Sequence, residues 1–234
     1  GMVKQIDFST LMASSVHDMK NIIAAVSQAY ESLVAQLPPE LQQSAEVRLI
    51  ERESLRLDGM LVQLLGMYKF EHGQLSLQSE YCRVDDLFED LHNRHAELLR
   101  YRQVELRIEL DDPDLEGFFD RNLIVTVLDN ALGNALNHCR SAICLHARAG
   151  EGGIVLSLCD DGPGYPEAML GPVRERDASG IDRSSGSTGL GLYFAASIVA
   201  MHDQPGCEAG LELKNGGPLG GACLQVSLPL PSLF

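Results

Sequence analysis

The spacing of apolar residues in the first third of the chain limits the possible folds more than any other feature of the sequence. These residues recur alternately four and three positions apart, which is typical of helices that pack against one another along a seam. The first run consists of Met12, Val16, Met19, Ile23, Val26, Tyr30, Leu33 and Leu37. The second run, with one polar member, consists of Val47, Ile50, Ser54, Leu57, Leu61, Leu64 and Tyr68. Both runs are predicted to be long helices.

The segment Leu37-Pro38-Pro39-Glu40 separates the two runs. Proline stops one helix and is well tolerated in the first turn of the next, so residues 6–70 are predicted to form an antiparallel helical hairpin. A single hairpin of this length leaves apolar surface exposed. Two hairpins would bury that surface in a four-helix bundle, which predicts a homodimer.

The apolar period changes after Glu71-His72-Gly73, where short strand-like runs begin to alternate with helical stretches. This alternation indicates an α/β domain. The predicted strands are 104–110, 142–147, 154–159, 211–214 and 223–228. The predicted helices are 85–100, 121–138 and 189–202. The fold class is therefore α + α/β, with one domain at residues 1–72 and an α/β sandwich at residues 73–234.

The net charge of the chain argues against one class of binding partner, nucleic acids. With 33 acidic and 18 basic side chains, the formal net charge is -15. Such a surface repels a phosphate backbone, so no nucleic-acid partner is expected. No run approaches the ~18 apolar residues of a membrane span, and no signal peptide precedes the first helix. We therefore expect no direct membrane insertion in this segment and a cytoplasmic location, either alone or as part of a larger or membrane-associated protein.

The six cysteines show no C-x-x-C pair and no metal-ligand spacing. Several lie within apolar strand-like runs, as Cys144 does. The sequence predicts reduced thiols that pack as small hydrophobic groups, rather than disulfides or zinc ligands.

Polar residues recur every four positions in the predicted helix 121–138. Asn130, Asn134 and His138 therefore share one helical face. Amide oxygens are hard ligands that suit Mg²⁺ together with water and phosphate. Taken alone, this face is equally well explained as solvated.

A carboxylate and two glycines follow the predicted strand 154–159. Asp160 at a strand end can accept a hydrogen bond from the exocyclic amine of adenine, and Gly162 and Gly164 allow a base to lie against the backbone. An ordinary turn rich in Asp, Gly and Pro is the alternative interpretation of this motif alone.

A glycine-rich segment precedes the last predicted helix. It runs from Gly186 through Thr188, Gly189 and Leu190 to Gly191. Free backbone N–H groups and the positive end of the helix dipole would attract phosphate there. The segment is not a Walker loop, because no G-K-[ST] follows.

The three motifs in this order and spacing resemble the Bergerat-type ATP site shared by histidine kinases, DNA gyrase, MutL and heat-shock chaperones. The resemblance implies ATP and Mg²⁺ as cofactors, with Asn134 as the metal ligand and Asp160 as the adenine acceptor. Asn130, His138 and the motif glycines would line the nucleotide site, and residues 165–188 would form a lid over ATP.

The first predicted helix carries Ser15-Val16-His17-Asp18-Met19-Lys20-Asn21, which resembles the H-box of sensor histidine kinases. With Val16 and Met19 on the seam, His17 points outward. The resemblance implies that His17 is the phosphoacceptor, that Asp18 accepts its Nδ1–H so that Nε2 is the nucleophile, and that Asn21 orients a water for the reverse reaction. A solvated surface histidine is the alternative for His17 alone.

The resemblance as a whole implies a histidine protein kinase of a two-component system. It would phosphorylate His17 with ATP-Mg, pass the phosphoryl group to an aspartate on a response regulator receiver domain, and in some states dephosphorylate that partner. One alternative is a degenerate phosphotransfer scaffold dimer on the same fold. Another is a gyrase-type ATPase, although the first asparagine is flanked by Asp129 and no glutamate. The chain also lacks the proline that usually follows the H-box and the F-x-P-F lid motif of many family members.

Overall fold

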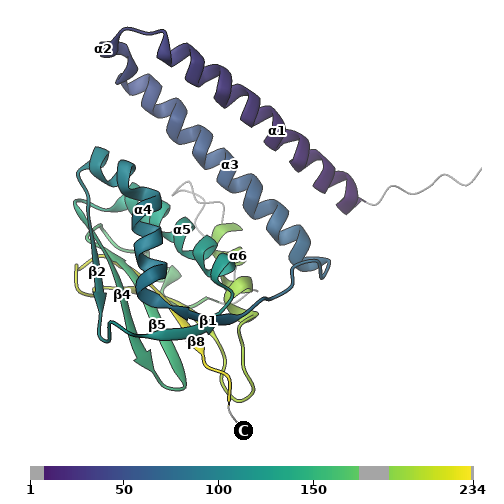
Figure 1. Ribbon diagram of the computed structural model, residues 1–234, viewed down its shortest axis with the longest axis vertical. Helices are drawn as coiled ribbons and strands as arrows, with labels where there is room; N and C mark the ends of the chain where they lie inside the picture. The colour runs from purple at the N-terminus through teal and green to yellow at the C-terminus, as the bar shows by residue number, and fades with distance from the viewer. Residues whose placement is uncertain (1–7, 174–189, 233–234) are drawn as a thin grey trace, which may run out of the picture. The chain divides into compact units, whose positions relative to one another are not determined.

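Two long helices form the first unit of the structure, a computed structural model that describes residues 8–173 and 190–232 (Figure 1). Helix α1 spans Phe8–Ala35, the short α2 spans Pro39–Gln42 and α3 spans Ala45–Glu71. Pro39 occupies the first turn of α2, and the Ser44 hydroxyl caps α3 by accepting the backbone N–H of Val47 at 3.3 Å. The predicted helical hairpin is confirmed.

The apolar seam of α1 divides into two sets of positions seven residues apart. Val16 is buried, at 3% exposure, and Tyr30 donates its hydroxyl proton to the carbonyl of Val47 at 2.8 Å. The other set, represented by Met19, Val26 and Leu33, is 49 to 59% exposed. One half of the seam therefore joins α1 to α3, and the other half faces outward.

The second unit begins at Ser76 and is built on a six-stranded sheet with the strand order β2-β4-β5-β8-β7-β6. Strands β2 and β4 are parallel and the other pairs are antiparallel. The strands of this sheet are β2 Glu105–Leu110, β4 Ala142–Gly150, β5 Gly153–Asp160, β6 Gly171–Pro172, β7 Gly210–Asn215 and β8 Ala222–Pro229. Strands β1, Glu80–Arg83, and β3, Glu116–Phe119, form a separate antiparallel pair.

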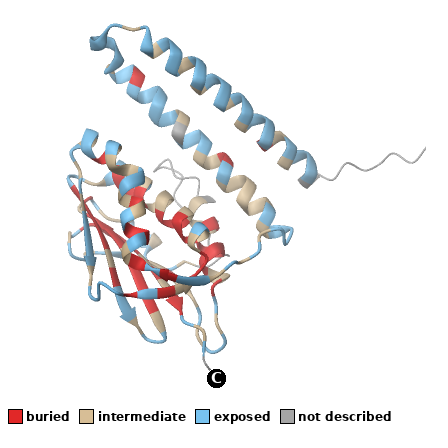
Figure 2. Ribbon diagram, in the orientation of Figure 1, coloured by how far each residue is buried: buried red, intermediate tan, exposed pale blue. Residues whose placement is uncertain are grey.

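Helices α4, Val84–Arg102, α5, Arg121–His138, and α6, Leu190–Ala200, cover one face of the large sheet (Figure 1). Their apolar sides and the strands beneath them form the buried core (Figure 2). Its largest fully buried side chains include Leu87, Phe88, Leu91, Ile124, Leu128, Leu132, Ile143, Leu145, Leu156 and Ile198. The predicted α/β sandwich is confirmed, although the sequence did not predict the short strands β1, β3 and β6.

Asp120 joins three segments at the start of α5. Its Oδ1 caps the helix by accepting the N–H of Leu123 at 3.1 Å, and its Oδ2 accepts the N–H of Gln78 at 2.9 Å. The backbone N–H of Asp120 donates to Nε2 of His202 at 3.1 Å, and Nδ1 of His202 lies 2.8 Å from the carbonyl of Ile198. These bonds tie the entry to the second unit and the end of α6 to the start of α5.

The structure corrects the expectation that all cysteines are reduced. Cys159 in β5 and Cys223 in β8 form a disulfide across 64 positions of sequence. The two residues are paired in register on adjacent antiparallel strands, and this pairing depends on a strand order that the sequence does not reveal. Cys82, Cys139, Cys144 and Cys207 are free thiols.

Among the helices of the described ranges, none has the length and apolar character needed to cross a membrane.

Candidate nucleotide site and phosphoacceptor

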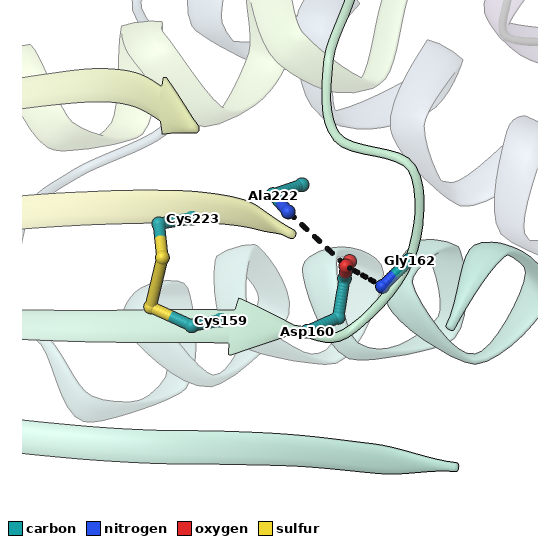
Figure 3. Close-up of a disulfide and its surroundings, with 5 residues drawn as sticks. All are labelled: Cys159, Asp160, Gly162, Ala222 and Cys223. Carbon is teal, nitrogen blue, oxygen red and sulfur yellow. Dashed lines mark hydrogen bonds between the residues drawn. A yellow bond between two sulfur atoms is a disulfide. The ribbon is translucent and has the colours of Figure 1, made fainter. Parts of the chain in front are cut away.

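Asp160 ends β5 and is 4% exposed. Its Oδ1 accepts the backbone N–H of Gly162 at 2.8 Å and that of Ala222, at the start of β8, at 3.1 Å (Figure 3). No residue within 8–173 or 190–232 donates a hydrogen bond to Oδ2. The carboxylate is thus held by one oxygen, and the other oxygen can accept a bond from a ligand.

Gly162 brings the second motif against the end of α5. A Cβ atom at this position would collide with the carbonyl oxygen of His138, so only glycine allows the loop to approach the helix this closely. The structure therefore places the predicted adenine motif next to the last turn of the helix that carries Asn134 and His138.

The predicted polar face of α5 is confirmed as a surface feature. Asn134 and His138 are exposed, and Asn130 is half-buried. The opposite side of the helix buries apolar residues such as Leu128 and Leu132. The polar side chains are therefore not needed for helix packing and are available to a ligand.

Asn215, at the end of β7, is a site residue that the sequence analysis missed. Its Oδ1 accepts the N–H of Tyr165 at 2.7 Å, and its Nδ2 donates to the carbonyl of Tyr165 at 2.9 Å. A Cβ atom on Gly164, where φ is +86°, would also meet the Asn215 side chain. An Asn-Gly-Gly run such as that at 215–217 is typical of a turn, but no local signal links it to a residue fifty positions earlier.

The phenol of Tyr165 is close enough to Asp160 to be affected by its charge. Burial, with a smaller contribution from the negative charge of Asp160, raises the pKa of Tyr165 to about 12. The hydroxyl is therefore neutral and can donate or accept a hydrogen bond at neutral pH.

Asp161 faces the other way and holds the loop between α5 and β4. It accepts the N–H groups of Arg140 and Ser141 at 2.7 and 3.0 Å and the hydroxyl of Ser141 at 2.9 Å. Partial burial raises the pKa of Asp161, but these hydrogen bonds outweigh it and bring the pKa down to about 2. The adjacent aspartates thus differ: Asp161 holds the loop with both oxygens, whereas Asp160 is held through Oδ1 alone by the described residues.

Most of the third motif, Gly186, Thr188 and Gly189, lies outside the described residues. Leu190 begins α6, and Gly191 is half-buried in its first turn. Of the predicted lid, residues 165–173 are described. They contain a short 3-10 helix, Glu167–Met169, and strand β6, which pairs with β7.

The carboxylate next to the first motif asparagine is engaged in helix packing. Asp129 accepts a hydrogen bond from the Arg94 guanidinium at 2.7 Å and lies 2.9 Å from Nε2 of His95. Both partners belong to α4. Asp129 therefore joins α4 to α5.

The predicted phosphoacceptor segment lies on the exposed side of α1. The side chains of His17 and Asp18 are 72% and 73% exposed, and Nδ1 of His17 lies 3.9 Å from Oδ1 of Asp18, beyond hydrogen-bond distance. Asn21, one turn later, places its amide nitrogen 3.5 Å from the same Nδ1 atom. The three residues form one exposed group, in which Asn21 is closer to the imidazole than Asp18.

Known proteins similar to this chain include ATPases of one family and sensor kinases. Residues 119–232 match the family of histidine kinase-, DNA gyrase B- and HSP90-like ATPases. The chain is 27% identical over 198 residues to the alginate biosynthesis sensor protein KinB of Pseudomonas aeruginosa, covering 83% of this chain and 33% of KinB. It is 28% identical over 192 residues to the sensor histidine kinase CpxA of Escherichia coli, covering 80% of this chain and 40% of CpxA. The chain thus spans well under half the length of these relatives.

Among solved structures, the histidine kinase AdeS of Acinetobacter baumannii has a similar fold, with a TM-score of 0.61 at 16% sequence identity. The similarity covers 92% of this chain and 98% of that structure. Both parts of the fold, the helical unit and the sheet domain, are therefore matched together. With the family match over residues 119–232 and the related sensor kinases, this shared fold supports a histidine kinase core with an ATP-binding domain.

Proposed function

We propose that this chain binds ATP-Mg in its second unit and transfers the γ-phosphoryl group to His17. The phosphohistidine would then donate the group to an aspartate on a response regulator receiver domain. The observation that carries the proposal is the half-satisfied, buried carboxylate of Asp160 in a domain of the ATP-binding family. In this proposal, residues 1–72 serve dimerisation and phosphotransfer, and residues 73–234 bind ATP.

Adenine recognition would use Oδ2 of Asp160. Two backbone N–H groups hold Oδ1, which keeps the side chain in one rotamer before any ligand arrives. A carboxylate oxygen that accepts no bond from the described residues is a strong acceptor for the exocyclic amine of adenine. Gly162, Gly164 and the Asn215–Tyr165 hydrogen bonds would shape the surface against which the base lies.

The α5 residues suit a site for Mg²⁺ and phosphate. Asn134 is exposed and offers one amide oxygen, a hard ligand that Mg²⁺ accepts. No group of three or more His, Cys, Asp or Glu side chains in the described part of the chain could hold a metal ion. The remaining ligands would be phosphate oxygens and water, with Asn130 and His138 on the same helical face. The Gly186–Gly191 segment would supply phosphate contacts at the start of α6.

At the phosphoacceptor, Nε2 of His17 would form a bond to the γ-phosphorus as the bond to the bridging oxygen of ADP breaks. For Nε2 to attack, the proton of the neutral imidazole must be on Nδ1. If the Asn21 amide turns by about 180°, its Oδ1 takes the place of Nδ2, 3.5 Å from Nδ1 of His17. Oδ1 would then accept the Nδ1–H. Asp18, 3.9 Å away, would stabilise the positively charged ring as the bond forms. In the reverse reaction, Asn21 would orient a water toward the phosphorylated partner.

A homodimer would complete the helical unit. The outward half of the α1 seam, with Met19, Val26 and Leu33, repeats every seven residues, and Ile50 and Leu57 continue such a row on α3. Burial of these rows against a second hairpin would form a four-helix bundle. We place this dimer in the cytoplasm, as the catalytic part of a longer sensor.

A gyrase-type ATPase is less well supported than a kinase. That mechanism needs a free carboxylate near the first asparagine to activate water, and Asp129 is engaged by Arg94 and His95. A degenerate scaffold is also disfavoured, since Asn134, Asp160 and the site glycines are all retained.

The test is incubation with γ-labelled ATP and Mg²⁺, followed by acid and alkali treatment of the labelled protein. We expect alkali-stable, acid-labile label on the wild type and none on the His17→Ala variant. The His72→Ala variant, which alters another exposed histidine of the helical unit, should keep the label. Label that persists in His17→Ala would overturn the assignment of the phosphoacceptor, and ATP binding without label would favour the scaffold.

A further inference from the structure

Three cysteines lie side by side on the face of the large sheet opposite the helices. Cys144 in β4 is in register with Cys159 in β5, and Cys159 is in register with Cys223 in β8. The row continues to Lys214 in β7, which is paired with Cys223. Alternation along the strands places Leu158 and Leu224 on the other face, under the helices. The sulfur row, although buried, therefore lies on the opposite side of the sheet from the core beneath the helices.

A cavity of about 190 Å³ opens over this row. Its lining includes both members of the disulfide, together with Lys214, His146 and Gly217. Cys159 and Cys223 are only 3% and 6% exposed, so the cavity is the route by which a small molecule would reach the sulfur atoms. The ammonium group of Lys214 lies 3.8 Å from the carboxylate of Glu212, and the Lys214 side chain is exposed.

The disulfide is directly connected to the carboxylate of the nucleotide site. Cys159 precedes Asp160 and Cys223 follows Ala222, and the N–H of Ala222 donates to Oδ1 of Asp160 at 3.1 Å (Figure 3). The N–H of Gly221 donates to the backbone carbonyl of Asp160 at 3.0 Å. The β7–β8 turn also covers the sulfur atoms, because a Cβ on Gly217 would collide with Sγ of Cys223.

We propose that Cys159 and Cys223 form a thiol–disulfide exchange site for low-molecular-weight thiols and disulfides, and that its oxidised form holds Asp160 in the geometry that binds nucleotide. The inference rests on the proposed function, since it regulates the same site. The disulfide fixes the ends of β5 and β8 relative to each other. In the reduced form the two thiols must separate to van der Waals distance, which loosens the bond between Ala222 and Asp160.

Reduction of the protein disulfide consumes two equivalents of the small thiol. A thiolate of the reductant attacks Sγ of Cys159, the bond between the protein sulfurs breaks, and Cys223 leaves as a thiolate beside Lys214. A second thiolate attacks the mixed disulfide and releases Cys159. Two protons complete the protein thiols, and the two electrons come from the small thiols, which leave as their disulfide. Oxidation by a small disulfide is the reverse reaction.

Cys144 is a bystander in this exchange. Burial and, to a smaller extent, the charge of Glu109 raise the pKa of the Cys144 thiol to about 11. A protonated thiol is a poor nucleophile, so Cys144 does not displace Cys223 at neutral pH although it lies beside Cys159. This makes Cys144 a matched control for the pair.

The test uses the whole chain, either oxidised with glutathione disulfide or reduced with dithiothreitol and desalted. Of the six cysteines, we expect all to react as thiols in the denatured reduced protein and only the four free ones to react after oxidation. Peptide mapping should locate the bond between Cys159 and Cys223. Calorimetry with ADP should give a dissociation constant about threefold to tenfold weaker in the reduced protein, the scale of one hydrogen bond.

Two variants separate the pair from its neighbour. Cys223→Ser should bind ADP equally under both conditions, at the affinity of the reduced wild type, whereas Cys144→Ser should keep the redox response. Six reactive thiols after oxidation, a bond to another cysteine, or equal ADP affinity in both states of the wild type would overturn the inference. ADP binding in neither state would instead overturn the proposed function.

Discussion

Ser141 donates both its backbone N–H and its hydroxyl to the carboxylate of Asp161, at 3.0 and 2.9 Å. This contact fixes the end of β5 to the start of β4, next to Asp160 of the candidate nucleotide site. The two aspartates therefore allow the stability of the domain and its ligand binding to be tested separately.

Asp161→Asn should destabilise the second unit by about 1–3 kcal/mol, because a charged acceptor of several hydrogen bonds is lost. The pKa of Asp161 is about 2 in the folded protein and about 4 in an unfolded chain. The stability from this group is thus complete above about pH 4 and is lost as the pH falls toward 2. Urea denaturation at pH 7 and pH 3 checks this, and an equal difference between wild type and variant at both pH values would contradict it.

Asp160→Asn should weaken ADP binding about tenfold to a hundredfold, which corresponds to a charge-assisted hydrogen bond of roughly 1.5–3 kcal/mol. The amide oxygen can still accept the N–H groups of Gly162 and Ala222, so the fold is expected to survive. The amide nitrogen would then face the amine of adenine, donor against donor. Calorimetry of both aspartate variants tests the assignment, and a larger loss of affinity for Asp161→Asn would reverse it.

Asn215→Ala should reduce both ADP affinity and thermal stability, because Tyr165 loses two backbone hydrogen bonds. Asn215→Asp is a sharper test. It keeps an acceptor for the N–H of Tyr165 but places a carboxylate oxygen against its carbonyl, so we expect it to bind ADP no better than the alanine variant. Wild-type affinity in either variant would show that the contact is not part of the site.

The second unit should lose stability as the pH falls below about 6.5, the ordinary pKa of histidine. Burial lowers the pKa of His202, and protonation of Nε2 would remove the acceptor of the Asp120 N–H. A lowered folded-state pKa means that this stability is complete above pH 6.5 and is lost below it. Between pH 8 and pH 5, the melting temperature should fall less for His202→Gln than for wild type, because glutamine does not titrate. The control variant His92→Gln should behave as the wild type does. Parallel curves for all three proteins would refute this role.

Val26→Glu should prevent dimerisation, because Val26 lies in the outward half of the α1 seam and is 59% exposed in the single chain. Gln28→Glu, on another exposed face of the same helix, should remain dimeric. Light scattering measures both masses. A dimeric Val26→Glu protein would place the interface elsewhere.

The long helices were predictable because their apolar residues repeat over many turns. The five main strands were predictable because each is a short apolar run or alternates apolar and polar residues, next to turn residues. Strands β1 and β3 have only four residues each, too few for a period to be visible. The β6 strand has two residues and exists only through its pairing with β7.

By itself, the sequence determined the two-part fold, the order of the nucleotide motifs and the position of the exposed His17, because each depends on local period or local residue types. The tertiary structure alone decided which distant residues meet. It paired Asn215 with Tyr165, used Asp129 to join two helices, and set Cys159 against Cys223. These contacts depend on strand order and register, and in a sheet register is set by the packing of the whole domain.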